Sequence, residues 1–364
     1  MVETSRTIAY NDERVIDRYT EKRPLYEKFV LHLADMDRGL MDKAGIEVHA
    51  VEHRAKSVES FRDKIRRPGK HYGNPLQDVS DLVGVRVILY YEEDVRKVCN
   101  LLKREFIIVK SQSADKAKMR TEDRFGYLSD DYVAKLSKSR QRLSEWAKYK
   151  ELKVEIQVRT VLQHAWAAYS HKLYYKQESL FSEQYRRRLV RLAGLLELAD
   201  EEFGDLKKQA LTRSRRAKRQ LSQGRYGLKV NLTSVTEYVR TSEVVARIAK
   251  MFKKFGFQIN DHFDNAEQLT LVAVRLQLNT IAKLNSALKK SVAELDSFLP
   301  AFIHEKFGEG KSQWSIFPVA GDPDHWATVA LLQSVAKDLS TQELRRLVSW
   351  GEEYLNAVIS ARHT

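Results

Sequence analysis

One short stretch, Lys153 to Thr160, constrains the fold more than any other part of the chain. Val154, Ile156 and Val158 alternate with polar residues, which predicts a strand with one apolar face and one charged face. An exposed strand would alternate in the same way. However, a helical run rich in His and aromatic residues, Val161 to Lys176, follows at once. A strand end followed directly by such a helix favours a functional site over a solvated face.

Length and charge narrow the classes of protein. A chain of 364 residues can form two domains, each with its own core. The net charge of +14 favours polyanionic partners. Because no apolar run approaches the roughly 20 residues of a membrane span, and no signal peptide or lipidation motif is seen, we favour nucleotides or nucleic acid over a membrane. Cys99 is the only cysteine, which excludes intrachain disulfides and thiolate zinc sites, so we expect a cytoplasmic protein.

A second segment places cations beside a helix start. Arg54 and Lys56 precede a helix that we expect to begin near Ser57, on which Ser60 and Lys64 lie one turn apart. Cations and a hydroxyl beside the free N–H groups of a helix start suit a polyphosphate. A basic, solvated helix face would show the same residues, so the pattern alone leaves both interpretations open.

A third segment places a carboxylate before a buried strand. Asp81 precedes the apolar run from Val85 to Tyr90, which is typical of a buried strand. A lone Asp at this position is usually a turn residue.

These three segments, in this order, resemble the synthetase domain of the RelA/SpoT family, which are ATP-dependent pyrophosphokinases that make the alarmone (p)ppGpp. The resemblance rests on VEIQVRT with its following helix, on the spacing of Arg54, Lys56, Ser60 and Lys64, and on DLVGVR. It covers roughly residues 45–206 and is closest to the small, stand-alone synthetases. It implies an α/β (α+β) fold with a mixed, nucleotidyltransferase-like sheet of about five strands flanked by helices.

The resemblance also implies how ATP is held. Arg54 and Arg86 are expected on opposite sides of the adenine, and Lys56, Ser60 and Lys64 at the phosphates.

The resemblance assigns catalysis to Asp81 and Glu155, with both as ligands of a Mg²⁺ cofactor. A metal bridging the ATP phosphates neutralises charge as the pyrophosphoryl group moves. Glu155 is the residue that we expect to activate the acceptor hydroxyl.

The acceptor loop departs from the family pattern. The family reads Gly-Tyr-x-Ser-x-His, and here Asp131 stands where His is expected. A carboxylate cannot donate a hydrogen bond as His can, and it repels phosphate, so the identity of the acceptor stays open. The expected acceptor-binding residues are Gly126, Tyr127, Ser129, Gln157, Arg159 and His164.

The remainder of the chain divides into further segments. We expect an N-terminal helical segment (1–44) interrupted near Pro24, the synthetase domain (45–206), a basic helix end or linker (207–227) and an α-rich C-terminal domain (228–364) of unknown role, for which regulation is one candidate. Predicted helices there cover 241–255, 280–302 and a final helix capped by Ser340 and Glu343. An apolar helix seam from Phe181 to Leu206 could pack on the sheet or on a second copy of the chain.

The stretch from Leu206 to Thr236 contains nine basic residues and no acid. It could be a solvated helix end or a nucleic-acid patch, and the sequence leaves both open.

Three functions follow as hypotheses. The first is transfer of pyrophosphate from ATP to the 3′-hydroxyl of GDP or GTP. The second keeps the chemistry but uses the 3′ end of tRNA, as in toxins of fused toxin–antitoxin (CapRel) type, whose inhibitory C-terminal domain answers phage infection. The third is a catalytically inactive nucleotide-sensing module, against which the presence of Asp81 and Glu155 argues. Alarmone hydrolysis is not expected, because none of the ten His residues precedes an Asp.

Overall fold

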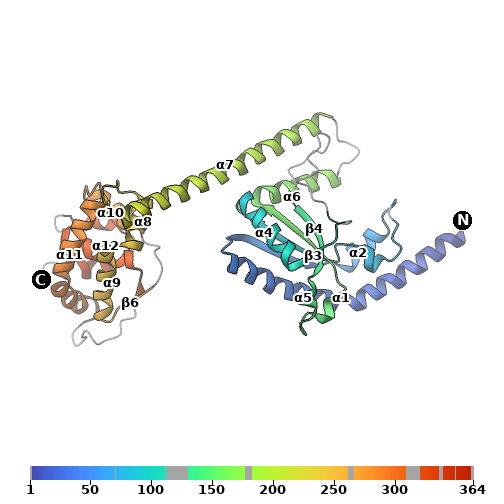
Figure 1. Ribbon diagram of the computed structural model, residues 1–364, viewed down its shortest axis with the longest axis horizontal. Helices are drawn as coiled ribbons and strands as arrows, with labels where there is room; N and C mark the ends of the chain where they lie inside the picture. Colours follow the sequence, from blue (N-terminus) through green and yellow to red (C-terminus); the bar gives the residue numbers. More distant parts are fainter. Residues whose placement is uncertain are drawn as a thin grey trace. The chain divides into compact units, whose positions relative to one another are not determined.

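The computed structural model describes residues 2–69, 71–110, 113, 130–176, 183–260, 266–308, 320–335, 339–348 and 350–361. The chain forms two compact units, Met1–Lys207 and Lys208–Thr364. The first contains the main sheet with its helices, and the second is mostly helical (Figure 1). Within the described ranges, no helix is both long and apolar enough to cross a bilayer.

The N-terminal helix, α1 (Val2–Ala44), buries a stripe of apolar side chains in the core of the first unit. Pro24 lies inside this helix and does not interrupt it, so the predicted interruption is wrong. An internal proline removes one backbone hydrogen bond. Tyr19 and Phe29, on either side of it, are both fully buried, and their packing keeps the two halves of the helix on the same core.

The predicted mixed sheet of about five strands is present, and among the described residues its strands follow the order β1-β2-β5-β4-β3. The strands are β1 (Val48–Ala55), β2 (Val83–Leu89), β3 (Phe106–Ile108), β4 (Asp130–Leu136) and β5 (Val154–Thr160). β2 and β5 pair in parallel at the centre, and the other pairings are antiparallel. β1 runs as far as Ala55, which places Arg54 within the sheet.

The two faces of the central strand differ as its alternation predicts. Val154, Ile156 and Val158 are buried in one core with α1 and with α4 (Glu92–Glu105). Glu155 and Gln157 therefore lie on the opposite face. That face is the one left for a polar site.

Further helices complete the first unit. They are α2 (Val58–Ile65), α3 (Pro75–Asp78), α5 (Lys138–Gln141), a 3₁₀ turn (Ala147–Tyr149), α6 (Val161–Lys176) and α7 (Glu183–Ser222). α6 follows β5 without an intervening loop, as predicted. α7 continues through most of the basic stretch and ends in the second unit.

In the described part of the second unit, seven helices and a two-stranded sheet pack around a separate apolar core. The helices are α8 (Leu232–Thr241), α9 (Glu243–Lys254), α10 (Ala266–Arg275), α11 (Ile281–Phe307), α12 (Pro323–Val335), α13 (Thr341–Leu347) and α14 (Glu352–Ala361), and the strands are β6 (Gln258–Ile259) and β7 (Ala320–Gly321). Ser340 and Glu343 form the predicted capping box. The prediction of a single final helix is wrong, because the backbone becomes extended at Val348 and a separate helix, α14, follows.

A buried polar contact ties α7 to the end of the central strand. Thr160, which is fully buried, donates a hydrogen bond of 2.6 Å from its hydroxyl to Asp200 on α7. Gln163 binds the same residue, because its side-chain oxygen accepts a hydrogen bond from the Thr160 N–H at 2.9 Å. Burial, with a smaller contribution from Glu92, raises the pKa of Asp200 to about 7. At pH values between the ordinary pKa of Asp and this raised pKa, the folded chain therefore keeps the Asp200 carboxyl protonated, whereas an unfolded chain has released that proton.

This raised pKa predicts a loss of stability as the pH rises. Below about pH 4 the carboxyl is protonated in both states, and between about pH 4 and 7 only the folded state keeps the proton. The free energy of unfolding should fall over that range by up to about 1.4 kcal/mol per pH unit. Asp200→Asn keeps a hydrogen-bond acceptor for Thr160 but carries no charge. The melting temperature of this variant, relative to that of wild type, should therefore increase as the pH rises from 5 to 8.

The control is Glu201→Gln, which removes an exposed carboxylate from the same helix. Its melting temperature should follow the wild-type pH dependence. An unchanged pH dependence in Asp200→Asn would show that another group carries the effect.

Candidate functional site

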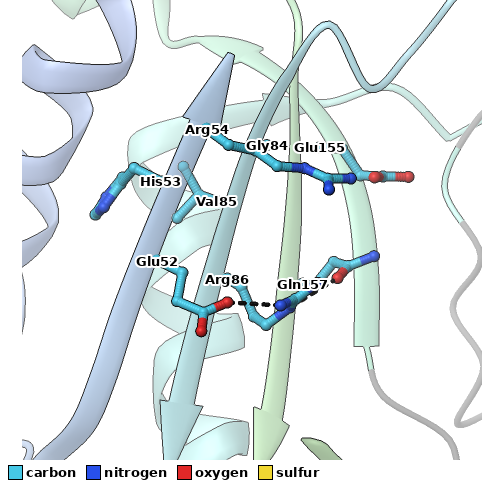
Figure 2. Close-up of a pocket in the computed structure, with 8 residues that line it drawn as sticks. All are labelled: Glu52, His53, Arg54, Gly84, Val85, Arg86, Glu155 and Gln157. Atoms are coloured by element: carbon cyan, nitrogen blue, oxygen red, sulfur yellow. Dashed lines mark hydrogen bonds and ion pairs between the residues drawn. The ribbon is translucent and has the colours of Figure 1, made fainter. Parts of the chain in front are cut away.

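A pocket of about 300 Å³ lies on the polar face of the sheet, where β1, β2 and β5 run side by side. Its lining residues come from these three strands and are drawn in Figure 2: Glu52, His53, Arg54, Gly84, Val85, Arg86, Glu155 and Gln157.

The first row of the pocket is set by strand register. Arg54 on β1 pairs with Gly84 on β2, and Gly84 in turn pairs with Glu155 on β5. A Cβ atom at Gly84 would lie 3.5 Å from Cγ and Nε of Arg54. Because glycine has no side chain there, the Arg54 side chain crosses over it toward Glu155 (Figure 2). A cation and a carboxylate are thus brought together across three strands.

The second row consists of Glu52, Arg86 and Gln157, each of which lies two residues from the first row on its own strand. Arg86 donates to Glu52 at 2.5 Å and, through Nε, to Gln157 at 3.3 Å. Arg54 and Arg86 therefore project from neighbouring rows of the same face and line the same pocket. Such a pair of guanidinium groups can contact both sides of a flat ligand.

A compact ion cluster lies at the entrance of β2. Lys56 donates to one oxygen of Asp81 at 2.7 Å, and Lys64 on α2 donates to the other at 2.8 Å. The side chains of Lys56 and Asp81 are only 10% and 12% exposed. Both carboxylate oxygens are thereby engaged by ammonium groups in a place shielded from water.

The two carboxylates of the site differ in their proton affinity. Burial by itself would raise the pKa of Asp81, but hydrogen bonds from Lys56 and Lys64 outweigh it and hold the pKa below its usual value. Burial raises the pKa of Glu155, and the negative charges of Asp81 and Asp131 raise it further. Asp81 is thus a stable anion, while Glu155 binds a proton more readily than an ordinary Glu.

The helix start beside this cluster forms as predicted. Ser57 is the N-cap of α2, and its hydroxyl accepts from the N–H of Ser60 at 3.1 Å. Ser60 and Lys64 follow one turn apart on this helix. Arg54 lies within β1, however, rather than at the mouth of the helix.

Three of the expected acceptor-binding residues lie in β5 and in the first turn of α6, and they are Gln157, Arg159 and His164. Arg159 is 6% exposed and donates to Gln157 at 2.7 Å. Burial, and next the charge of Arg86, lower the pKa of His164 in the first turn of α6. Nδ1 of His164 and Nε of Arg159 are buried and have no hydrogen-bond partner among the described residues.

The other three expected acceptor residues, Gly126, Tyr127 and Ser129, lie outside the described residues. Asp131 is described and pairs with Gln157 across β4 and β5. Directly opposed residues share a face, so Asp131 faces the same side of the sheet as the pocket.

A metal would need ligands besides the protein. No group of three or more His, Cys, Asp or Glu side chains among the described residues is placed to hold an ion. Asp81 and Glu155 are two carboxylates close enough to influence each other's charge, which fits a divalent cation completed by substrate phosphates.

Sequence reasoning missed Glu52 and Gly84. Glu52 precedes Arg54 by two residues, so the period-two pattern of a strand that includes both would have placed Glu52 on the site face. Gly84 is identifiable only from the register between β1, β2 and β5.

Comparison with known proteins shows what this region is similar to. Residues 53–180 match the family described as "Region found in RelA / SpoT proteins". The chain is 28% identical over 195 residues to GTP pyrophosphokinase YwaC of Bacillus subtilis (strain 168), covering 51% of this chain and 89% of that protein. It is 25% identical over 171 residues to GTP pyrophosphokinase YjbM of the same strain, covering 44% and 72%.

Solved structures cover a similar share of the chain. Small alarmone synthetase 1 from Bacillus subtilis, bound to its product pppGpp, is 24% identical, with coverage of 53% of this chain and 98% of that one and a TM-score of 0.44.

Proposed function

We propose that this site transfers the β,γ-pyrophosphate of ATP to the 3′-hydroxyl of GDP or GTP, which yields (p)ppGpp. The match of residues 53–180 to the RelA/SpoT family, and the similarity to proteins named GTP pyrophosphokinase, support this proposal. The observation that carries the proposal is the pair of lysines, Lys56 and Lys64, held on Asp81 beside Glu155. Cations for a polyphosphate and carboxylates for a metal and a proton lie together there, next to the pocket.

ATP binding uses the pocket and the start of α2. Arg54 and Arg86 contact the two faces of adenine, each contributing roughly 0.5–2 kcal/mol. Lys56, Ser60 and Lys64 contact the phosphates. The first N–H groups of α2 add a favourable dipole for an anion.

Phosphate binding changes the partners of the two lysines. In the structure their ammonium groups donate to Asp81. When ATP binds, its phosphates compete for the same donors, and the Asp81 oxygens become available to Mg²⁺, which Asp81 and Glu155 would hold. The bound ion supplies neutralisation of the phosphate charge.

The chemistry then needs one proton acceptor. Glu155 takes the proton of the acceptor 3′-hydroxyl, since its carboxylate lines the pocket and lies near Asp81. The 3′-oxygen forms a bond to the β-phosphorus of ATP. The bond from that phosphorus to the α,β-bridging oxygen breaks, and AMP leaves with the electron pair.

The 3′ end of tRNA is a second candidate acceptor, which Asp131 favours. A carboxylate on the site face repels the di- or triphosphate of a guanine nucleotide, whereas a tRNA 3′ end carries fewer charges close to its terminal hydroxyl. Full-length protein incubated with γ-labelled ATP and with GDP, GTP or tRNA would distinguish the two. We expect label in GDP or GTP, and label in tRNA alone would refute that acceptor.

Removing either catalytic carboxylate should abolish most of the activity. Asp81→Asn or Glu155→Gln should lower pyrophosphate transfer by on the order of 10²-fold or more, because each loses a preorganised charge at the reacting phosphates. Transfer is measured with labelled ATP, and circular dichroism checks that the variants fold. Turnover near the wild-type rate in either variant contradicts its role.

Removing either arginine of the pocket should weaken ATP binding. Arg54→Ala and Arg86→Ala should each raise the ATP dissociation constant by about 2- to 30-fold, the equivalent of roughly 0.5–2 kcal/mol. Isothermal titration calorimetry measures this directly. Arg96→Ala removes an exposed arginine from α4, away from the pocket, and should leave the constant unchanged. Unchanged ATP affinity in both pocket variants would place adenine elsewhere.

Neutralising Asp131 should favour guanine nucleotides. Asp131→Asn removes roughly 1 kcal/mol of repulsion, so the KM for GDP should fall by about fivefold. Use of tRNA should change little. Steady-state kinetics with each acceptor measure the difference, and a KM for GDP that stays the same or rises would mean that Asp131 does not face the acceptor phosphates.

A further inference from the structure

A concave basic surface lies at the C-terminal end of α7, within the second unit. Two adjoining cavities of about 720 and 280 Å³ share Arg216 and Gln220 in their walls. Five cationic residues line the pair, and no acidic residue does so. We call this surface the basic groove, and its cations are Arg213, Arg216, Arg219, Arg225 and Lys229.

The walls of the basic groove are fixed by buried contacts. On one side, Ala217 and Leu221 of α7 are buried in the unit's core. α7 then ends in a left-handed glycine, Gly224 (φ +71), and the N–H of Arg225 donates back to the Gln220 carbonyl at 2.9 Å. On the other side, the Leu228 carbonyl accepts from Ile281 at 2.9 Å. The groove is therefore preformed.

The charges of the basic groove are not neutralised from within. None of its five cations forms an ion pair with an acid of the described residues. Glu237, a buried acid on α8, is already engaged by Ser214 at 2.6 Å and by Arg240 at 3.6 Å. Like charges gathered in one concavity repel one another, so an anion bound there relieves the repulsion.

The arrangement of the cations suits phosphates along a chain. Arg213, Arg216 and Arg219 recur every third residue, which spaces their Cα atoms by roughly 4.5 Å along the axis of α7. Lys229 and Arg225 face them from the following segment. Several cations spread over one concave surface can each contact a different phosphate of a polynucleotide, whereas a free phosphate offers a single compact group.

Gln220 adds a feature that phosphate contacts do not use. It lines both cavities, and its side-chain oxygen is buried without a hydrogen-bond partner among the described residues. A buried acceptor without a donor is unfavourable, so turning toward a donor in the groove is favoured. The ribose 2′-hydroxyl is such a donor, and it is the group by which proteins distinguish RNA from DNA.

We propose that the basic groove binds an RNA strand, with its cations on the phosphates and Gln220 accepting from a 2′-hydroxyl. This binding is separate from the chemistry on the sheet and holds whichever acceptor the enzyme uses.

The test uses the full-length protein and a fluorescent 12-nucleotide RNA. Its 3′ end carries a phosphate, so it cannot accept pyrophosphate, and ATP is omitted. Binding is measured by anisotropy as a function of salt. Arg213→Gln with Arg216→Gln should reduce the slope of log affinity against log salt by about 1.4, since each lost contact to a single strand removes about 0.7.

The matched control removes the same charge from the same helix. Arg215 and Lys218 are exposed on α7 and line neither cavity. Arg215→Gln with Lys218→Gln should keep nearly the wild-type slope. Equal losses in both double variants would show only a diffuse basic surface, and no loss in either would show no contact at all. Both results would overturn the proposal.

The role of Gln220 is tested with DNA of the same sequence. Wild type should bind the RNA several-fold more tightly than the DNA. Gln220→Met keeps the length of the side chain without its acceptor, so RNA affinity should fall to the DNA level while the salt slope stays unchanged. Equal binding of RNA and DNA by wild type would overturn the assignment to RNA.

Discussion

The parallel pairing of β2 with β5 is the constraint on which the site depends. It places Gly84 beside Glu155 and Arg86 beside Gln157, while the antiparallel β1 adds Arg54 to the first row and Glu52 to the second. Because side chains alternate between faces, a shift of one residue in either pairing would turn these groups into the apolar core. The buried Val154, Ile156 and Val158 on the other face make that shift costly. The same apolar residues that stabilise the sheet therefore fix the geometry of the polar ones.

Local patterns predicted much of this architecture from sequence. The alternation in β5, the immediate start of α6 and the cap at Ser57 are short-range features, and each was found in the structure where the pattern placed it. Features set by distant contacts were missed. We predicted a break in α1 at Pro24, but the packing of Tyr19 and Phe29 keeps the helix continuous. The roles of Glu52 and Gly84 depend on register, which no single segment encodes.

The chain uses its positive charge in two physically different ways. Lys56 and Lys64 are held by a largely buried carboxylate, so their interaction is only weakly screened by salt. The cations of the basic groove are exposed and have no acidic partner among the described residues, so whatever they bind responds strongly to ionic strength. A net charge of +14 thus does not describe one uniform surface.

The contact of Asp81 with both lysines has a consequence for selectivity among anions. Asp81 acts as an intramolecular competitor, always present at high local concentration, that any incoming anion must displace. Inorganic phosphate offers a single group and makes no further contacts. When it binds, the lysines exchange the Asp81 carboxylate for a phosphate with little gain in free energy. Under the proposed function, a nucleoside triphosphate would bring several phosphates, and its base would fill the neighbouring pocket. The Asp81 carboxylate would then exclude abundant small anions from the lysines and admit only a ligand that is recognised at both ends.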